Sequence, residues 1–98
     1  MDKEKILNLV IESVKDLSEE LDNESLKNSD INTKLYGRDG NLDSLTLVSL
    51  ITDLEGKIYE QFKKEIVIAD ERAMSQKRSP FKDINSLTDY IEQLLQEV

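Results

Sequence analysis

Hydrophobic residues recur every three or four positions along the first twenty residues of the chain, and charged residues fill most positions between them. The recurring positions are Ile6, Val10, Val14, Leu17 and Leu21, with Leu7 and Ile11 beside them. A helix turns once in about 3.6 residues, so this spacing gathers the apolar side chains on one face. The pattern predicts an amphipathic helix from about Asp2 to Leu21.

A second segment with the same periodicity predicts a helix that begins at Asp43 or Ser44 and ends near Lys64. Its inner positions are Leu47, Ile51, Leu54, Ile58 and Phe62, flanked by Val48 and Leu50. Gly56 lies inside this helix, but the apolar positions after it stay in phase, so we do not expect the helix to end there.

A third periodic segment predicts a last helix from about Ser86 to Val98. Its inner positions are Leu87, Ile91, Leu94, Leu95 and Val98. Ser86 and Asp89 stand three residues apart at its start and approximate a capping box.

The connections between these helices differ in length and composition. Residues 22–43 are rich in Asn, Asp, Ser and Gly, which is typical of a loop. Four residues are expected to hold this loop on the core, with or without a short turn of helix in it. Gly37 and Gly40 allow backbone conformations with positive φ just before the next helix. The four residues that hold the loop are Ile31, Leu35, Tyr36 and Leu42.

After the second helix, Ile66-Val67-Ile68 fits either a short strand or a buried connector. A short helix is expected from Glu71 to about Ser75, with Asp70 as its cap, and Ser79-Pro80 marks a turn. The predicted fold is therefore all-α: a four-helix bundle with three main helices, a short third helix and a long loop between helices one and two. With 98 residues, the chain is expected to form a single domain, 1–98.

Composition and charge restrict the partners of such a domain. Charged residues make up 35% of the chain, and the formal net charge is −8. Nucleic acids are poor partners for this surface, because phosphate binding depends on clustered lysine and arginine. An anionic membrane would repel it, whereas basic proteins are complementary to it.

The chain contains no cysteine and no histidine. This excludes disulfides, thiolate nucleophiles and the commonest general base. No apolar run is long enough to span a bilayer, and the N-terminus lacks the apolar stretch of a signal peptide, so we expect a cytoplasmic protein.

The junction between the long loop and the second helix reads Gly40-Asn41-Leu42-Asp43-Ser44-Leu45. A helix start carries unpaired N–H groups and a partial positive charge, which favours a nearby anion by roughly 0.3–1 kcal/mol. An anionic group at this junction would stand where the helix favours negative charge. Aspartate and serine are also common N-caps, so capping alone is the simpler interpretation of either residue.

Taken together, the helix order and the Asp43-Ser44-Leu45 motif resemble the acyl carrier protein family, over nearly the whole chain from Ile6 to Leu95. The resemblance implies that Ser44 is the attachment point of 4′-phosphopantetheine, whose thiol carries acyl groups as thioesters. It implies a carrier that is not itself an enzyme and has no catalytic residue or metal site of its own. Its partners would be a phosphopantetheinyl transferase and acyl-loading, condensing or acyl-transferring enzymes, and a monomer suits this shuttling role.

The same resemblance implies a docking surface around the serine. In it, Asp43 helps to position the transferase and its metal, and Leu45 offers an apolar contact. The full set of expected partner-recognition residues is Asp43, Leu45, Thr46, Val48, Ser49, Thr52 and Glu55.

The second helix departs from the carriers of primary fatty-acid synthesis in its charge. Thr46 and Ser49 stand where acids are usual, and Gly56 stands where another acid is common, although Glu55 matches a later acidic position. This more neutral helix indicates a specialised carrier in a dedicated pathway, whether polyketide-like, lipid-modifying or aminoacyl-loading.

Several alternatives fit the sequence less well than this hypothesis. Ser49 and Ser86 also precede leucine, but neither follows an acid. Asp39, Asn41 and Asp43 alternate as in an EF-hand, but Ser44 replaces the required glycine and Leu50 the bidentate glutamate. The abundant carboxylates mark no pocket for acid–base catalysis. The main rival is a helical interaction adaptor without a prosthetic group, in which Ser44 only caps the helix.

Overall fold

The structure of the chain is a computed structural model, and it describes residues 3–22, 24–36, 40, 42–68 and 80–97. Its helices are α1 (Lys3–Leu21), α2 (Glu24–Lys27), α3 (Ser44–Phe62) and α5 (Ile84–Glu97). The β-pairing among these residues consists of two isolated bridges, Lys34 with Asp83 and Tyr36 with Leu42. The expectation of an all-helical fold is therefore confirmed. The short helix predicted at 71–75 lies outside the described residues.

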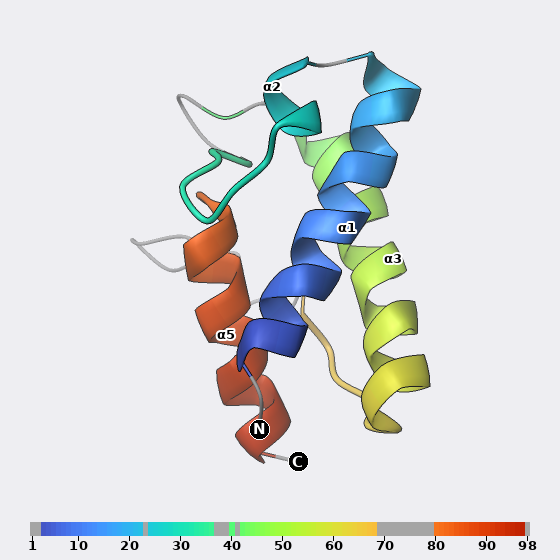
Figure 1. The fold of residues 1–98 in the computed structure, drawn as a ribbon. Coiled ribbons are helices and arrows are strands. Elements are labelled where there is room, and N and C mark those ends of the chain that lie inside the picture. The colour runs from blue at the N-terminus through green and yellow to red at the C-terminus, as the bar shows by residue number, and fades with distance from the viewer. Residues whose placement is uncertain (1–2, 23, 37–39, 41, 69–79, 98) are drawn as a thin grey trace.

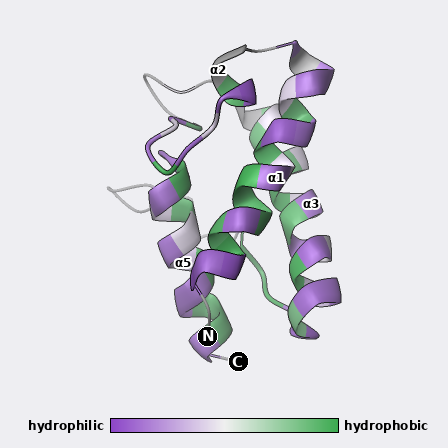
Figure 2. Cartoon of the chain, viewed as in Figure 1, coloured by the Kyte–Doolittle hydropathy of each residue, from purple (hydrophilic) through white to green (hydrophobic). Residues whose placement is uncertain are grey.

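The three long helices lie side by side, with α1 between α3 and α5 in the view of Figure 1. α1 contacts both of them, and it also contacts the single turn of α2 that follows it. Lys3, at the start of α1, forms an ion pair with Asp89 of α5. In Figure 2 hydrophobic and hydrophilic residues alternate around each long helix, as expected for helices with one apolar stripe.

The core is built mainly from the predicted apolar stripes. Its helical members are Ile6, Val10, Val14, Leu26, Leu47, Leu50, Ile51, Leu54, Ile58, Ile84, Leu87, Ile91, Leu94 and Leu95. Leu17 and Phe62 pack against this core but are only partly buried. Val98 and the side chain of Leu21 lie outside the described residues.

Val48 was expected beside the inner stripe of α3, but half of its side chain is exposed (51%). Each helical residue is rotated by about 100° from the one before it. Leu47 and Ile51 define the buried face, and Val48 lies one residue beyond Leu47, toward solvent. The Val48 side chain therefore contributes to an apolar outer surface and not to the core.

The cap of the last helix also differs from the prediction. α5 begins at Ile84, two residues earlier than expected, and Asp83 caps it. The Asp83 carboxylate accepts a 2.7 Å hydrogen bond from the backbone N–H of Ser86. The Asp83 carbonyl accepts the first helical bond, from Leu87 N–H. The predicted Ser86–Asp89 capping box is wrong, because Ser86 already belongs to the first turn.

The loop segment 31–36 is fastened to the start of α5 by backbone hydrogen bonds. Leu35 N–H donates to the Lys82 carbonyl and Tyr36 N–H to the Phe81 carbonyl, both at 2.9 Å. Thr33 and Ile31 in turn accept from Ile84 and Asn85. Leu35 is buried and Tyr36 packs partly against the core, as expected. Ile31 is 38% exposed, so it is held by its backbone and not by burial.

α3 ends with a left-handed residue and a buried connector. Lys63 has φ 57° and ψ 30°, and its N–H donates to the Tyr59 carbonyl, which closes the helix. Beyond it Ile66 and Ile68 are buried while Val67 is 62% exposed. Of the two sequence interpretations, the buried connector fits, because 66–68 takes part in no β-pairing among the described residues.

No helix in the described part of the chain is long and apolar enough to cross a membrane.

Candidate functional site

The start of α3 is organised by Asp43. Its backbone is extended (φ −86°, ψ 176°), and its carboxylate accepts a 2.8 Å hydrogen bond from Thr46 N–H. Its carbonyl accepts the first helical bond, from Leu47 N–H. Hydrogen bonds from Thr46, through the side chain first and the backbone amide second, hold the pKa of Asp43 below its usual range. A charged carboxylate therefore remains at the positive end of the helix near neutral pH.

Ser44 is the first residue of α3, directly after this cap. The first N–H groups of a helix have no partner within the helix, and they point out of its N-terminal end. The backbone at Ser44 thus lies where the partial positive charge of the helix is concentrated. Of the two residues that the sequence offered as N-cap, Asp43 takes the role, which leaves Ser44 without that task.

Leu45 follows immediately and is 78% exposed, the largest exposed fraction among the exposed large hydrophobic side chains of the described residues. A leucine gains little from the core in this position, because most of its surface faces water. Together with half-exposed Val48, one turn later, it forms an apolar surface beside Ser44.

The other predicted partner-recognition residues of α3 extend this surface. Ser49 and Thr52 are exposed, and Thr46 is half-buried. The Thr52 hydroxyl donates a 3.0 Å hydrogen bond to the Val48 carbonyl of its own helix. The described structure therefore brings Asp43, Leu45, Val48, Ser49 and Thr52 to the outer side of one helix.

Glu55 has a different environment from the rest of the predicted set. Its carboxylate accepts a 2.8 Å hydrogen bond from the backbone N–H of Ile68, thirteen residues further along the chain. This bond ties the connector after α3 back to the middle of the helix. The side chain is half-buried and has an intramolecular role that the sequence pattern did not indicate.

The loop that leads into α3 is held from the other side. Leu42 is buried (6% exposed), and its N–H donates to the Leu35 carbonyl at 2.9 Å. Gly40 lies against the same backbone: a Cβ added there would be 2.5 Å from the Leu35 carbonyl oxygen and 2.8 Å from Tyr36 Cα. Only glycine fits this close approach. The residue before Asp43 is therefore fastened, through Leu35, to the backbone that begins α5.

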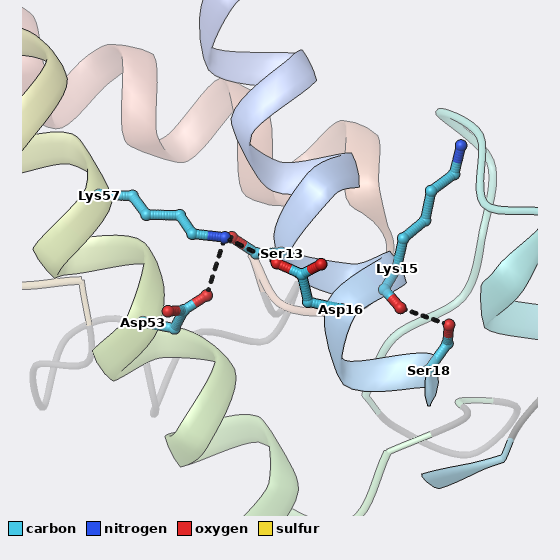
Figure 3. Close-up of polar contacts among 6 residues, drawn as sticks. All are labelled: Ser13, Lys15, Asp16, Ser18, Asp53 and Lys57. Atoms are coloured by element: carbon cyan, nitrogen blue, oxygen red, sulfur yellow. Dashed lines mark hydrogen bonds and ion pairs between the residues drawn. The ribbon is translucent and has the colours of Figure 1, made fainter. Parts of the chain in front are cut away.

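Lys57 of α3 contacts polar groups of α1, and sequence reasoning missed this contact (Figure 3). Its ammonium group lies 3.0 Å from Ser13 Oγ, 3.3 Å from Asp16 Oδ2 and 3.2 Å from Asp53 Oδ2. These residues line a groove of about 370 Å³ between the two helices. Partial burial lowers the pKa of Lys57, but its hydrogen bonds and charge interactions with Asp53 and Asp16 together outweigh burial, and the pKa is raised.

The sequence by itself predicts only part of this contact. Asp53 and Lys57 stand four residues apart, which predicts a pair on one helix face. Nothing in the sequence places Ser13 and Asp16 next to them, because that depends on how two helices pack.

In the described part of the chain, no group of three or more acidic side chains is placed to hold a metal ion. Asp39 and Asn41, which alternate with Asp43 in the sequence, lie outside the described residues.

Comparison of the chain with protein-family models, with curated proteins and with solved structures returned no match.

Proposed function

We propose that this chain is an acyl carrier protein, with 4′-phosphopantetheine attached to Ser44. The observation that carries the proposal is the order of residues at the start of α3. A capping aspartate is followed by a serine at the first helical position and then by a leucine that is 78% exposed. The three long helices, which lie side by side in Figure 1, support the same proposal.

The chemistry required of the protein is modest. The arm would be joined through a phosphodiester to the Ser44 oxygen, and its terminal thiol would form the thioester with the acyl group. The cofactor therefore supplies the reactive sulfur, which suits a chain without cysteine or histidine. The protein's own contribution is to present the serine and to favour the phosphate by the helix start.

The surface next to Ser44 would dock the partner enzymes. A phosphopantetheinyl transferase would contact Leu45 and Val48 and approach the charged Asp43. Enzymes that load, condense or transfer the acyl group would use the same outer side of α3. Because Thr46 and Ser49 stand where acids are usual in carriers of fatty-acid synthesis, the proposed carrier serves a specialised pathway, as a monomeric cytoplasmic shuttle.

Intact-protein mass after coexpression with a broad-specificity phosphopantetheinyl transferase tests the proposal. The wild-type chain is expected to gain one phosphopantetheine group, and Ser44→Ala to gain none while its far-ultraviolet circular dichroism is unchanged. Ser86→Ala is the matched control, since Ser86 also precedes a leucine in the first turn of a helix. Modification of Ser44→Ala, or a folded wild-type protein left unmodified, overturns the proposal.

A helical interaction adaptor is the second candidate, favoured by the exposure of Leu45 and Val48. It would bind another protein through the outer side of α3 and carry no arm. The mass experiment separates the two functions, because an adaptor stays unmodified under the same conditions.

A further inference from the structure

A second stripe of largely apolar and small residues runs along the outer face of α3, and we refer to it as the outer stripe. Successive residues of a helix are rotated by about 100°, so positions spaced by three and four residues fall within a sector of about 80°. The members of the outer stripe, all exposed to solvent, are Leu45, Val48, Thr52, Gly56 and Tyr59. Their spacing is that of a helix that packs against a second helix.

The outer stripe distinguishes α3 from the other two long helices. None of the exposed large hydrophobic side chains in the described segments belongs to α1 or α5, whereas three of them are members of the outer stripe. Its one polar member, Thr52, donates its hydroxyl to the Val48 carbonyl at 3.0 Å. Covering Thr52 would therefore leave no unsatisfied donor, and burial of the stripe would carry no such penalty.

Gly56 makes a hollow in the second half of the outer stripe. A Cβ added there would meet no atom within 4 Å. Gly56 and Tyr59 also line an open groove of about 690 Å³ between α3 and the connector that follows it. The helix therefore has large apolar side chains near its start, at Leu45 and Val48, and a hollow beside Tyr59 in its second half.

The outer stripe is symmetric about Thr52. Val48 and Gly56 stand four residues to either side of Thr52, and Leu45 and Tyr59 stand seven residues to either side. A two-fold axis at Thr52 would place two α3 helices antiparallel. Each Val48 would then face the hollow at Gly56 of the second copy, and each Leu45 the Tyr59 ring. A two-fold interface requires this kind of self-complementary surface.

The charges at the two ends of α3 fit the same antiparallel arrangement. The acid Asp43 stands at the start of the helix, and the exposed base Lys63 stands at its end. Two antiparallel copies bring each Asp43 to the end of the helix that carries the other Lys63. Glu60, eight residues after Thr52, would lie beside the N-terminal end of the second α3, where an acid is favoured by the helix dipole.

We infer that α3 pairs reversibly with α3 of a second copy of this chain, antiparallel and through the outer stripe. A stable interface of standard size has about 20 to 30 residues on each side, so one stripe of a single helix gives a weak and transient pair. The monomer therefore remains the form that meets partner enzymes at low concentration, and the pair is a resting state.

The functional consequence of pairing rests on the proposed function. Leu45 and Val48 belong both to the outer stripe and to the surface proposed for the phosphopantetheinyl transferase. The second copy and the transferase would therefore exclude one another, and pairing would protect Ser44 from modification. The pairing itself needs no covalent arm, so it can be measured on the unmodified chain.

Sedimentation equilibrium of the full, unmodified chain tests the inference. Concentrations from about 10 μM to about 1 mM cover the range of a weak pair. Salt at about 0.15 M limits the repulsion between two chains of net charge −8 to about 8 Å. We expect the average mass to rise from that of the monomer toward that of the dimer across this range.

Exchanging the facing large and small residues tests the register of the pair. Val48→Ala and Gly56→Val are each expected to weaken pairing about five-fold, the first by loss of contact and the second by filling the hollow. The double variant, Val48→Ala with Gly56→Val, is expected to recover most of the loss. Gly56→Val is decisive, because an added apolar group would strengthen association through a merely adhesive surface.

Two further variants complete the test. Ile31→Ala is the control, since Ile31 is an exposed apolar residue outside α3, and it is expected to leave pairing unchanged. Lys63→Glu reverses the charge that lies near Asp43 of the second copy. It is expected to weaken pairing about two- to five-fold, the range for exposed ion pairs.

A chain that stays monomeric to about 1 mM overturns the inference and leaves the outer stripe to a different protein. Stronger association of Gly56→Val, or equal weakening by Ile31→Ala and Val48→Ala, overturns it as well. The results are independent of the carrier proposal. A chain that gains phosphopantetheine but never pairs contradicts the pairing alone, and a chain that pairs but is never modified contradicts the carrier proposal alone.

Discussion

The starts of α3 and α5 use the same capping chemistry in opposite surroundings. Asp43 accepts from Thr46 N–H and Asp83 from Ser86 N–H, each across three residues. The leucine in the first turn of α3, Leu45, is 78% exposed, whereas Leu87 in the first turn of α5 is completely buried. Asp83 itself is largely covered, and Lys34 Nζ lies 4.0 Å from its carboxylate.

The comparison shows that a capped helix start with a serine in its first turn is not by itself a functional site. At α5 the cap, the backbone pairing with residues 31–36 and the buried leucine all stabilise the fold. At α3 the cap is equally sound, but the apolar residue beside it contributes almost nothing to the core. The exposed leucine is what singles out α3, and the predictions below test whether the two helix starts really divide these roles.

Truncating the two leucines is expected to give the largest contrast. Leu87→Ala removes a buried side chain and should lower the free energy of unfolding by about 2–5 kcal/mol. Leu45→Ala should change it by less than about 0.5 kcal/mol, because the side chain is mostly in water. Urea unfolding measures both.

The second measurement on these two variants is the rate of phosphopantetheine transfer, followed by intact-protein mass. It should fall for Leu45→Ala, while folded Leu87→Ala remains a substrate. A stability loss at Leu45 comparable with that at Leu87 would contradict the division between the two helix starts.

Gly40→Ala tests the fastening of the loop that leads into α3. The added methyl group meets the Leu35 carbonyl oxygen and the Tyr36 backbone, neither of which belongs to a flexible side chain. Overpacking of this kind costs about 2 kcal/mol, and we expect such a loss in the free energy of unfolding.

Gly56→Ala is the matched control for Gly40, because its added methyl group meets nothing. It should raise the free energy of unfolding by about 0.5–1 kcal/mol through helix propensity. If both substitutions changed stability in the same direction, the close approach at Gly40 would not be a constraint.

The α5 cap should have a smaller effect. Asp83→Ala leaves the Ser86 N–H without its acceptor and is expected to cost about 1 kcal/mol of unfolding free energy. Ser86→Ala should stay within about 0.5 kcal/mol, because the Ser86 backbone and not its side chain makes the bond. A larger loss of unfolding free energy in Ser86→Ala than in Asp83→Ala would support the capping box that the sequence pattern predicted.

The smallest effect concerns the titration of Asp43. Its pKa is lowered in the folded chain, so its contribution to stability is complete above the unfolded pKa and is lost as the pH falls through the folded value. The Thr46 amide shift, followed by NMR, should report a midpoint below the ordinary aspartate value of about 3.9. Asp43→Asn keeps an N-cap acceptor and should abolish this titration. A midpoint at or above the ordinary value would mean that the cap is not formed in solution.

The sequence by itself determined the helices and most of the core, because burial at helical spacing is a local property. The stripe through Val10 and Val14, and that through Leu54 and Ile58, are buried as their periodicity predicts. The same holds for the position of the helix start at Asp43 and Ser44, since an N-cap depends on residues within one turn, although the structure decided that Asp43 is the cap. The ends of the helices were predicted less accurately. Asp83 precedes the apolar positions from which α5 was predicted, so their periodicity could not show that Asp83 caps the helix.

Only the tertiary structure decided how distant segments constrain one another. Lys57 meets Ser13 and Asp16, and Glu55 meets Ile68, through packing that no local pattern encodes. The expected place of Val48 beside the buried stripe was wrong for the same reason, because the width of a buried stripe depends on how closely the neighbouring helices approach. Contacts between residues far apart in the chain depend on how all the helices pack against one another. These contacts occupy some polar groups of α3 and leave the others accessible to partner proteins.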